Sequence, residues 1–123
     1  MNPQHAIETL YATGKWLLDE GKSIQAADVF RVMMLVAPGD ERSWLGIGAC
    51  HEALLQAELA IDLYEKGEAA AQSGKCSIAR ARVFRMLGRD ADADAALEAA
   101  EGIADAIDDD DLRALLAHER SVS

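Results

Sequence analysis

The chain has 123 residues, a length that fits one compact domain or a short repeat array and excludes two independently folding catalytic lobes. The chain has 12 Lys and Arg residues against 22 Asp and Glu residues, so its formal net charge is −10. We expect neither a nucleic acid nor a membrane as partner, because binding to either needs clustered cations on the protein. Hydrophobic residues make up 50% and aromatic residues 5%, which favours closely packed helices over a β-sandwich and disfavours disorder.

The cellular setting is indicated by segments that the sequence lacks. The longest uninterrupted apolar run, Val32 to Ala37, is too short to cross a membrane, and the first ten residues lack the charged-then-apolar order of a signal peptide. Cys50 and Cys76 are too few for a disulfide framework and too far apart for a CxxC motif. We therefore expect a protein of a reducing cytoplasm.

Apolar periodicity and turn residues predict seven helices. In chain order they are Pro3 to Glu20, Ser23 to Val36, Asp40 to Leu54, Ala57 to Gln72, Cys76 to Leu87, Asp90 to Ala106 and about Asp109 to Glu119. Gly21, Pro38-Gly39, Ser73-Gly74 and Gly88 separate them as helix breakers. Trp16 and Trp44 are expected to be packing residues.

Three features of the sequence repeat in one register. The step is 34 residues from Gly14 to Gly48, from Ala26 to Ala60 and from Phe30 to Tyr64. It is 33 residues from Gly48 to Ala81, from Ala60 to Ala93 and from Tyr64 to Leu97. Small residues allow two antiparallel helices to approach closely, and the bulky residues fill the space beside them. We predict a single domain, residues 1–123, of three helical hairpins at about 7–40, 41–73 and 74–107, closed by a capping helix at about 109–119.

The spacing within each unit resembles the tetratricopeptide repeat. The second unit reads Trp44-x-x-Ile47-Gly48-x-x-His51 and then Ala60-x-x-x-Tyr64. The first unit has Gly14, Ala26 and Phe30 at the corresponding places, and Pro38 at the closing position. The predicted fold class is therefore all-α, a short right-handed solenoid whose first helices line a concave groove.

Helical periodicity then predicts which residues line that groove. One stripe of the first helices packs on the partner helix and comprises Leu10, Thr13, Gly14, Leu17, Trp44, Ile47, Gly48 and His51. The adjacent stripe faces the groove and comprises Tyr11, Lys15, Leu18, Leu45, Ala49, Glu52, Ile78, Arg82 and Arg85. Apolar positions mixed with cations suit an extended peptide. The alternative is that these residues only complete the packing between repeats.

Catalytic and metal-binding motifs are weak in this sequence. The segment Gly46 to His51 begins like a dinucleotide fingerprint but has His at the sixth position and lies within a helical pattern. The three histidines and two cysteines have no metal-ligand spacing, and a calcium loop starting at Asp108 would carry Arg113 where Gly is required. We predict no enzyme activity, no cofactor and no metal, and we keep a thiol enzyme based on Cys50 as an alternative.

The chain resembles the class II tetratricopeptide chaperones of type III secretion, which serve translocator proteins. The resemblance is carried by Leu10-Tyr11 through Gly21-Lys22, Ala26 to Phe30, the segment Leu45-Gly46-Ile47-Gly48-Ala49-Cys50, Ala60-Ile61 and Tyr64, and it covers roughly Leu10 to Ala104. It implies a bacterial cytoplasmic chaperone, linked to virulence, that holds a hydrophobic translocator segment in its groove until secretion.

The resemblance leaves two alternatives, one for the oligomeric state and one for the partner. Chaperones of this kind usually have more sequence before the first repeat, whereas nine residues precede Leu10 here, so a homodimer is possible but not indicated. The alternative function is a general tetratricopeptide adaptor that binds a peptide of another partner.

Overall fold

The computed structural model describes residues 2–122, and this part of the chain forms seven α-helices and no β-strand. They are α1 (Pro3–Asp19), α2 (Ser23–Val36), α3 (Glu41–Ala53), α4 (Ala57–Ala71), α5 (Gly74–Met86), α6 (Asp90–Ile107) and α7 (Asp110–Ser121). The all-α prediction is confirmed, and each predicted helix end lies within two residues of the observed one.

The odd-numbered helices share one kind of beginning. The side chains of Asn2, Asp40, Ser73 and Asp109 accept hydrogen bonds from backbone N–H groups in the first turns of α1, α3, α5 and α7. Because Ser73 acts as this cap, Gly74 is the first residue of α5 and not part of a longer turn. A Cβ atom on Gly74 would lie 2.3 Å from Leu112, so this glycine lets α7 pack closely against the start of α5.

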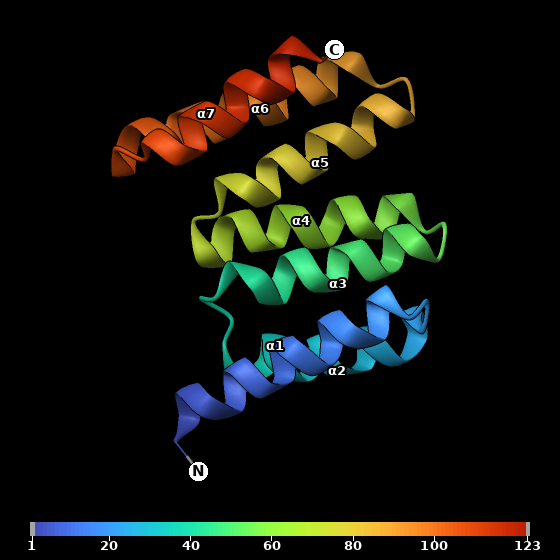
Figure 1. Cartoon of the computed structure of the whole chain (residues 1–123). Helices are drawn as coiled ribbons and strands as arrows, with labels where there is room; N and C mark the ends of the chain where they lie inside the picture. The colour runs from blue at the N-terminus through green and yellow to red at the C-terminus, as the bar shows by residue number, and fades with distance from the viewer. Residues whose placement is uncertain (1, 123) are drawn as a thin grey trace.

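The helices form two layers. α1 pairs with α2, α3 with α4 and α5 with α6, and these hairpins stack so that the two ends of the chain lie at opposite ends of the array (Figure 1). Within one layer α1, α3, α5 and α7 contact one another in sequence, whereas α2 and α4, like α4 and α6, do not pack directly on each other. α7 packs on both α5 and α6 and closes the array.

The hairpin interiors explain the sequence repeat. A Cβ atom on Gly14 would lie 2.8 Å from Phe30 Cζ, and one on Gly48 would lie 2.2 Å from Tyr64 Cε1. Each glycine therefore accommodates the aromatic ring of its partner helix. The other repeated positions, Ala26, Ala60, Ala81, Ala93 and Leu97, are all buried.

The two tryptophans behave differently. Trp44 is buried, and its Nε1 donates a hydrogen bond to the Pro38 carbonyl at 2.8 Å, which fixes the turn between α2 and α3. Trp16 is 56% exposed, so the expectation that it packs in the interior was wrong, and its ring lies 5.5 Å from the Lys22 ammonium. Thr13, placed by the sequence on the packing stripe, is exposed as well, whereas its neighbour Gly14 is buried against Phe30 of α2.

Replacing Gly48 with Ala should destabilise the fold. The added methyl group overlaps the Tyr64 ring, and overpacking of this kind costs about 1 to 3 kcal/mol. Gly102→Ala is the matched control, because no atom lies within 4 Å of the added Cβ and the change should stabilise the helix by up to about 1 kcal/mol. Urea unfolding of both variants measures the difference, and equal stabilities would contradict the packing described for Gly48.

Candidate peptide-binding groove

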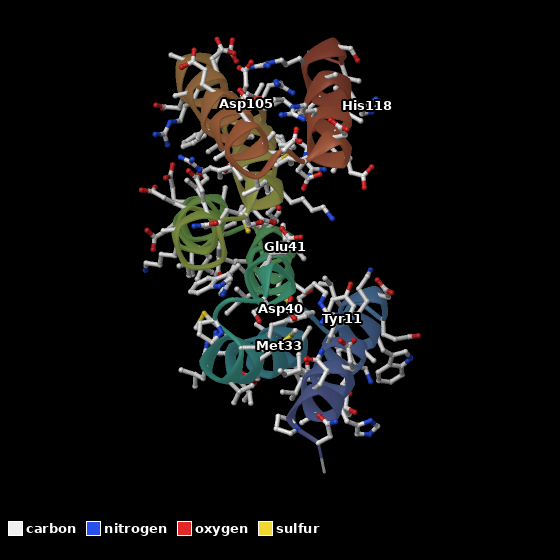
Figure 2. All side chains as sticks on the ribbon, turned by 90° about the vertical axis from the view of Figure 1, so that its left-hand side faces the viewer. Tyr11, Met33, Asp40, Glu41, Asp105 and His118 are labelled. Carbon is white, nitrogen blue, oxygen red and sulfur yellow. The ribbon has the colours of Figure 1, made fainter. Side chains whose placement is uncertain are left out.

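The odd-numbered helices define a concave side of the array. Figure 2 shows α1, which carries Tyr11, and α7, which carries His118, projecting toward the same side, with α3 set back between them. This curvature follows from stacking hairpins with a small rotation between neighbours. Two pockets lie on this side.

The first pocket, of about 170 Å³, lies between α1 and α3. Five residues of the predicted groove come together in it, namely Tyr11, Lys15, Leu18, Leu45 and Ala49. Phe30, Arg42 and Gly46 complete its lining. Most of this surface is apolar, so the pocket suits an aliphatic side chain of a bound peptide.

The floor of the first pocket is built by Phe30 of α2, a residue that the sequence placed only in the hairpin interior. A Cβ atom on Gly46 would lie 2.3 Å from Phe30 Cε1, so the glycine leaves the space that the ring occupies. The rings of Phe30 and Tyr11 meet edge to face, with centroids 6.4 Å apart. The buried ring thus supports both walls of the pocket.

Arg42 is a groove residue that sequence reasoning missed. Its guanidinium donates two hydrogen bonds of 2.9 Å to the Glu8 carboxylate of α1 and others to Asp40, and it lies 4.6 Å from the centroid of the Tyr11 ring. It therefore joins the start of α3 to α1 on the rim of the first pocket. The one available signal was the spacing of 34 residues between Glu8 and Arg42, the same step as the repeat.

The Arg42 contacts predict an acid-sensitive part of the stability. Hydrogen bonds from Arg42 lower the pKa of Glu8 and of Asp40 below the usual values of those carboxyl groups. A carboxyl group whose pKa is lower in the folded than in the unfolded chain stabilises the fold when the pH is above the unfolded-chain pKa. This stabilisation is lost as the pH falls through the folded-state pKa. We expect Arg42→Met to lower the melting temperature at pH 7, and we expect the difference from the parent protein to shrink below about pH 4. Thermal unfolding at several pH values measures it, and a difference that grows in acid would contradict the assignment.

The second pocket, of about 250 Å³, lies between α3, α5 and α7. Its lining comprises Leu45, Lys75, Ile78, Arg82, Leu115, His118 and Glu119. Leu45 lines both pockets and separates them. Ile78 is only 5% exposed, so it offers the groove a small part of its side chain, whereas Leu115 of α7 is 43% exposed. The groove therefore extends to α7, which the sequence assigned only a capping role.

The remaining predicted groove residues are held by partners within the chain. Glu119 of α7 is buried and pairs with Arg85 at 2.9 Å and with Arg82 at 3.5 Å. Glu52 accepts a hydrogen bond from the Tyr64 hydroxyl. Glu52 and Arg85 line neither of the two pockets, and Arg82, which is 59% exposed, keeps its side chain accessible in the second pocket.

Both cysteines carry free thiols and are buried in the interior of the array. Burial raises the pKa of the Cys50 thiol and of the Cys76 thiol to about 11 each. The His51 ring contacts Gln56, with 2.7 Å between Nδ1 and Oε1. Within residues 2–122 no group of three or more His, Cys, Asp and Glu side chains is placed to hold a metal ion.

Both thiols should therefore resist alkylation while the protein is folded. At pH 7 a thiol with so high a pKa is almost entirely protonated, and neither sulfur is exposed. We expect iodoacetamide to modify Cys50 and Cys76 at least about a hundredfold faster in urea than in buffer. Mass spectrometry follows the reaction, and rapid labelling of native Cys50 would instead support the thiol-enzyme alternative.

No helix in the part of the chain that the structure describes is both long and apolar enough to cross a membrane. No protein-family model matches the sequence, and no curated protein matches it either. Solved structures do match.

The matching structures include translocator chaperones of type III secretion. SycD of Yersinia enterocolitica superposes with a TM-score of 0.81 and 26% sequence identity, over 94% of this chain and 86% of that chain. PcrH from Pseudomonas aeruginosa gives 0.80 and 25%, over 98% of this chain and 90% of that chain. A type III secretion complex from Aeromonas hydrophila gives 0.77 and 29%, over 94% and 77%.

These neighbours confirm the resemblance seen in the sequence. The chain has the tetratricopeptide-like fold of the class II translocator chaperones. PcrH has been solved in complex with the chaperone binding regions of PopB and of PopD, and SycD in complex with a peptide of the translocator YopD.

Proposed function

We propose that this protein is a type III secretion chaperone that binds a hydrophobic segment of a translocator in its concave groove before secretion. The observation that carries the proposal is the apolar pocket between α1 and α3, walled by Tyr11 and Leu45 and rimmed by Lys15 and Arg42. The similar chaperones PcrH and SycD bind translocator regions, which supports the same class of partner for this groove.

The proposed mechanism is capture without chemistry. Aliphatic side chains of the translocator segment occupy the two pockets on either side of Leu45, and Lys15, Lys75 and Arg82 contact its carbonyl or carboxylate oxygens. Burial of those side chains keeps the segment from aggregating. Because no covalent step is required, the proposal includes neither enzyme activity nor a cofactor, and it places the protein in the bacterial cytoplasm, where translocators await export.

The proposal also includes a homodimer, in which a second copy of the chain is a partner. Val32, Leu35 and Val36 leave an apolar surface on the outer side of α2, each at least 48% exposed, and SycD has been solved as a dimer. Sedimentation velocity on the purified chain measures this association.

The function is tested by co-expressing this chain with a candidate translocator from the same genome. The translocator alone should be insoluble, and a complex should purify when both are expressed. A translocator that stays soluble alone, or one that does not copurify, contradicts the proposal.

A further inference from the structure

A trough lies at one edge of the array, where the turns between α2 and α3, between α4 and α5 and between α6 and α7 stand side by side (Figure 1). Figure 2 looks onto this edge and labels Asp40 and Glu41 there. The trough encloses about 560 Å³ and extends from the start of α1 to the start of α7. Its polar lining comprises Gln4, Asp40, Glu41, Gln72, Lys75 and Asp109.

The trough opens into the concave groove at Lys75. This residue lines the trough and also the second concave pocket, the one between α3, α5 and α7. Leu45 joins that pocket to the first one, so the two pockets and the trough form one continuous path over the surface. α7 closes the array and projects toward the concave side (Figure 2). A segment that occupies both concave pockets therefore meets α7, and beside α7 the path continues into the trough.

The carboxylates of the trough already have partners within the chain. Asp40 accepts hydrogen bonds of 2.8 and 3.1 Å from the Arg42 guanidinium. Glu41 accepts a hydrogen bond of 2.6 Å from Ser73 Oγ, and Asp109 caps the start of α7. Because these carboxylates serve the fold, the trough does not select a cationic occupant, and an uncharged stretch of chain suits it better.

Gln72 supplies hydrogen-bonding groups that the chain itself leaves unused. It follows α4 with φ 47° and ψ 47°, a left-handed conformation that strains residues other than glycine. Within residues 2–122 no hydrogen bond involves its side-chain amide, which has one acceptor oxygen and two donor hydrogens. Each peptide group of an extended segment offers one N–H donor and one C=O acceptor, so the backbone of such a segment matches this amide.

We propose that the translocator segment in the concave groove continues past Lys75 into this trough as an extended stretch with small or uncharged polar side chains. The inference rests on the function proposed above. The Lys75 ammonium, on a side chain that is 53% exposed, contacts a carbonyl oxygen where the segment crosses the edge, and the Gln72 amide bonds its backbone within the trough. The chaperone thereby shields a longer part of the translocator than the two concave pockets hold.

The test compares peptides of different length from a candidate translocator of the same genome. A truncation series first defines the short peptide, the shortest one whose binding Leu45→Glu weakens. Two further peptides are lengthened by about eight residues at one end or the other, which adds about 27 Å of extended chain. Fluorescence anisotropy measures their affinities for the full chain. We expect one lengthened peptide to bind at least about tenfold more tightly than the short peptide.

Gly39→Gln blocks the trough without disturbing the fold. Gly39 lines the trough, no atom lies within 4 Å of an added Cβ, and its φ is not positive. The variant should weaken the lengthened peptide about tenfold and leave the short peptide within about twofold. Gly102→Gln is the matched control, because its surroundings are equally open and it lies outside the trough, and it should leave both affinities unchanged.

Gln72→Gly separates binding from stability. Glycine adopts the left-handed conformation without strain, so the melting temperature should stay equal or rise, while the lengthened peptide should bind about threefold more weakly or worse. The inference is overturned if neither lengthened peptide gains affinity, or if Gly39→Gln or Gln72→Gly binds the lengthened peptide as well as the parent does. If no peptide depends on Leu45, the function proposed above fails, and this inference fails with it.

Discussion

Leu45→Glu is expected to weaken capture of a translocator segment strongly while leaving the fold intact. Leu45 is half-buried and lines both concave pockets, so a carboxylate there would face the apolar side chains of the bound segment from each pocket. Burial of an unpaired charge in a binding site costs on the order of 2 to 4 kcal/mol, which weakens binding about thirtyfold or more. Isothermal titration calorimetry with the purified segment measures the change.

The control for this variant is Leu59→Glu. Leu59 lies on α4, is 42% exposed and lines none of the concave pockets, so the same change of charge should leave the affinity within about twofold. Circular dichroism of both variants reports whether the helices persist. Retention of full affinity by a folded Leu45→Glu protein would place the translocator segment outside the groove.

Phe30→Ala is expected to be the most destabilising single change. Phe30 is 1% exposed, and its ring lies between Gly14 of α1 and Gly46 of α3, so it joins the first hairpin to the second. Truncation of a buried phenylalanine costs about 3 to 5 kcal/mol, a large share of the stability of a small domain. Urea unfolding measures the loss.

The matched control is Val32→Ala on the same helix. Val32 is 48% exposed, so its truncation should change the stability by less than about 0.5 kcal/mol. If Phe30→Ala lowers the free energy of unfolding by less than about 1 kcal/mol, neighbouring groups fill the cavity, and the ring is not needed to hold the two hairpins together. Because the ring also forms the floor of the first pocket, the variant tests how far the groove depends on the core.

The sequence by itself determined the helices and their pairing. The helix starts depend on local features, since side chains such as Asp40 and Ser73 cap the helices that follow them. The pairing of helices depends on the contact between a glycine and an aromatic ring, which recurs with the repeat. The stripe rule also brought Tyr11, Lys15, Leu18, Leu45 and Ala49 into one pocket, because each is set by the phase of its own helix.

Tertiary structure alone decided what lies between helices that are distant in sequence. The Arg42 contacts to Glu8, the Phe30 floor beneath Gly46 and the wall that α7 adds to the second pocket all join different hairpins. The outward position of Trp16 and the empty space beside Gly102 are of the same kind. Periodicity specifies which face of a helix is apolar, but which neighbour covers that face, or leaves it open, depends on how the hairpins rotate against one another when they stack.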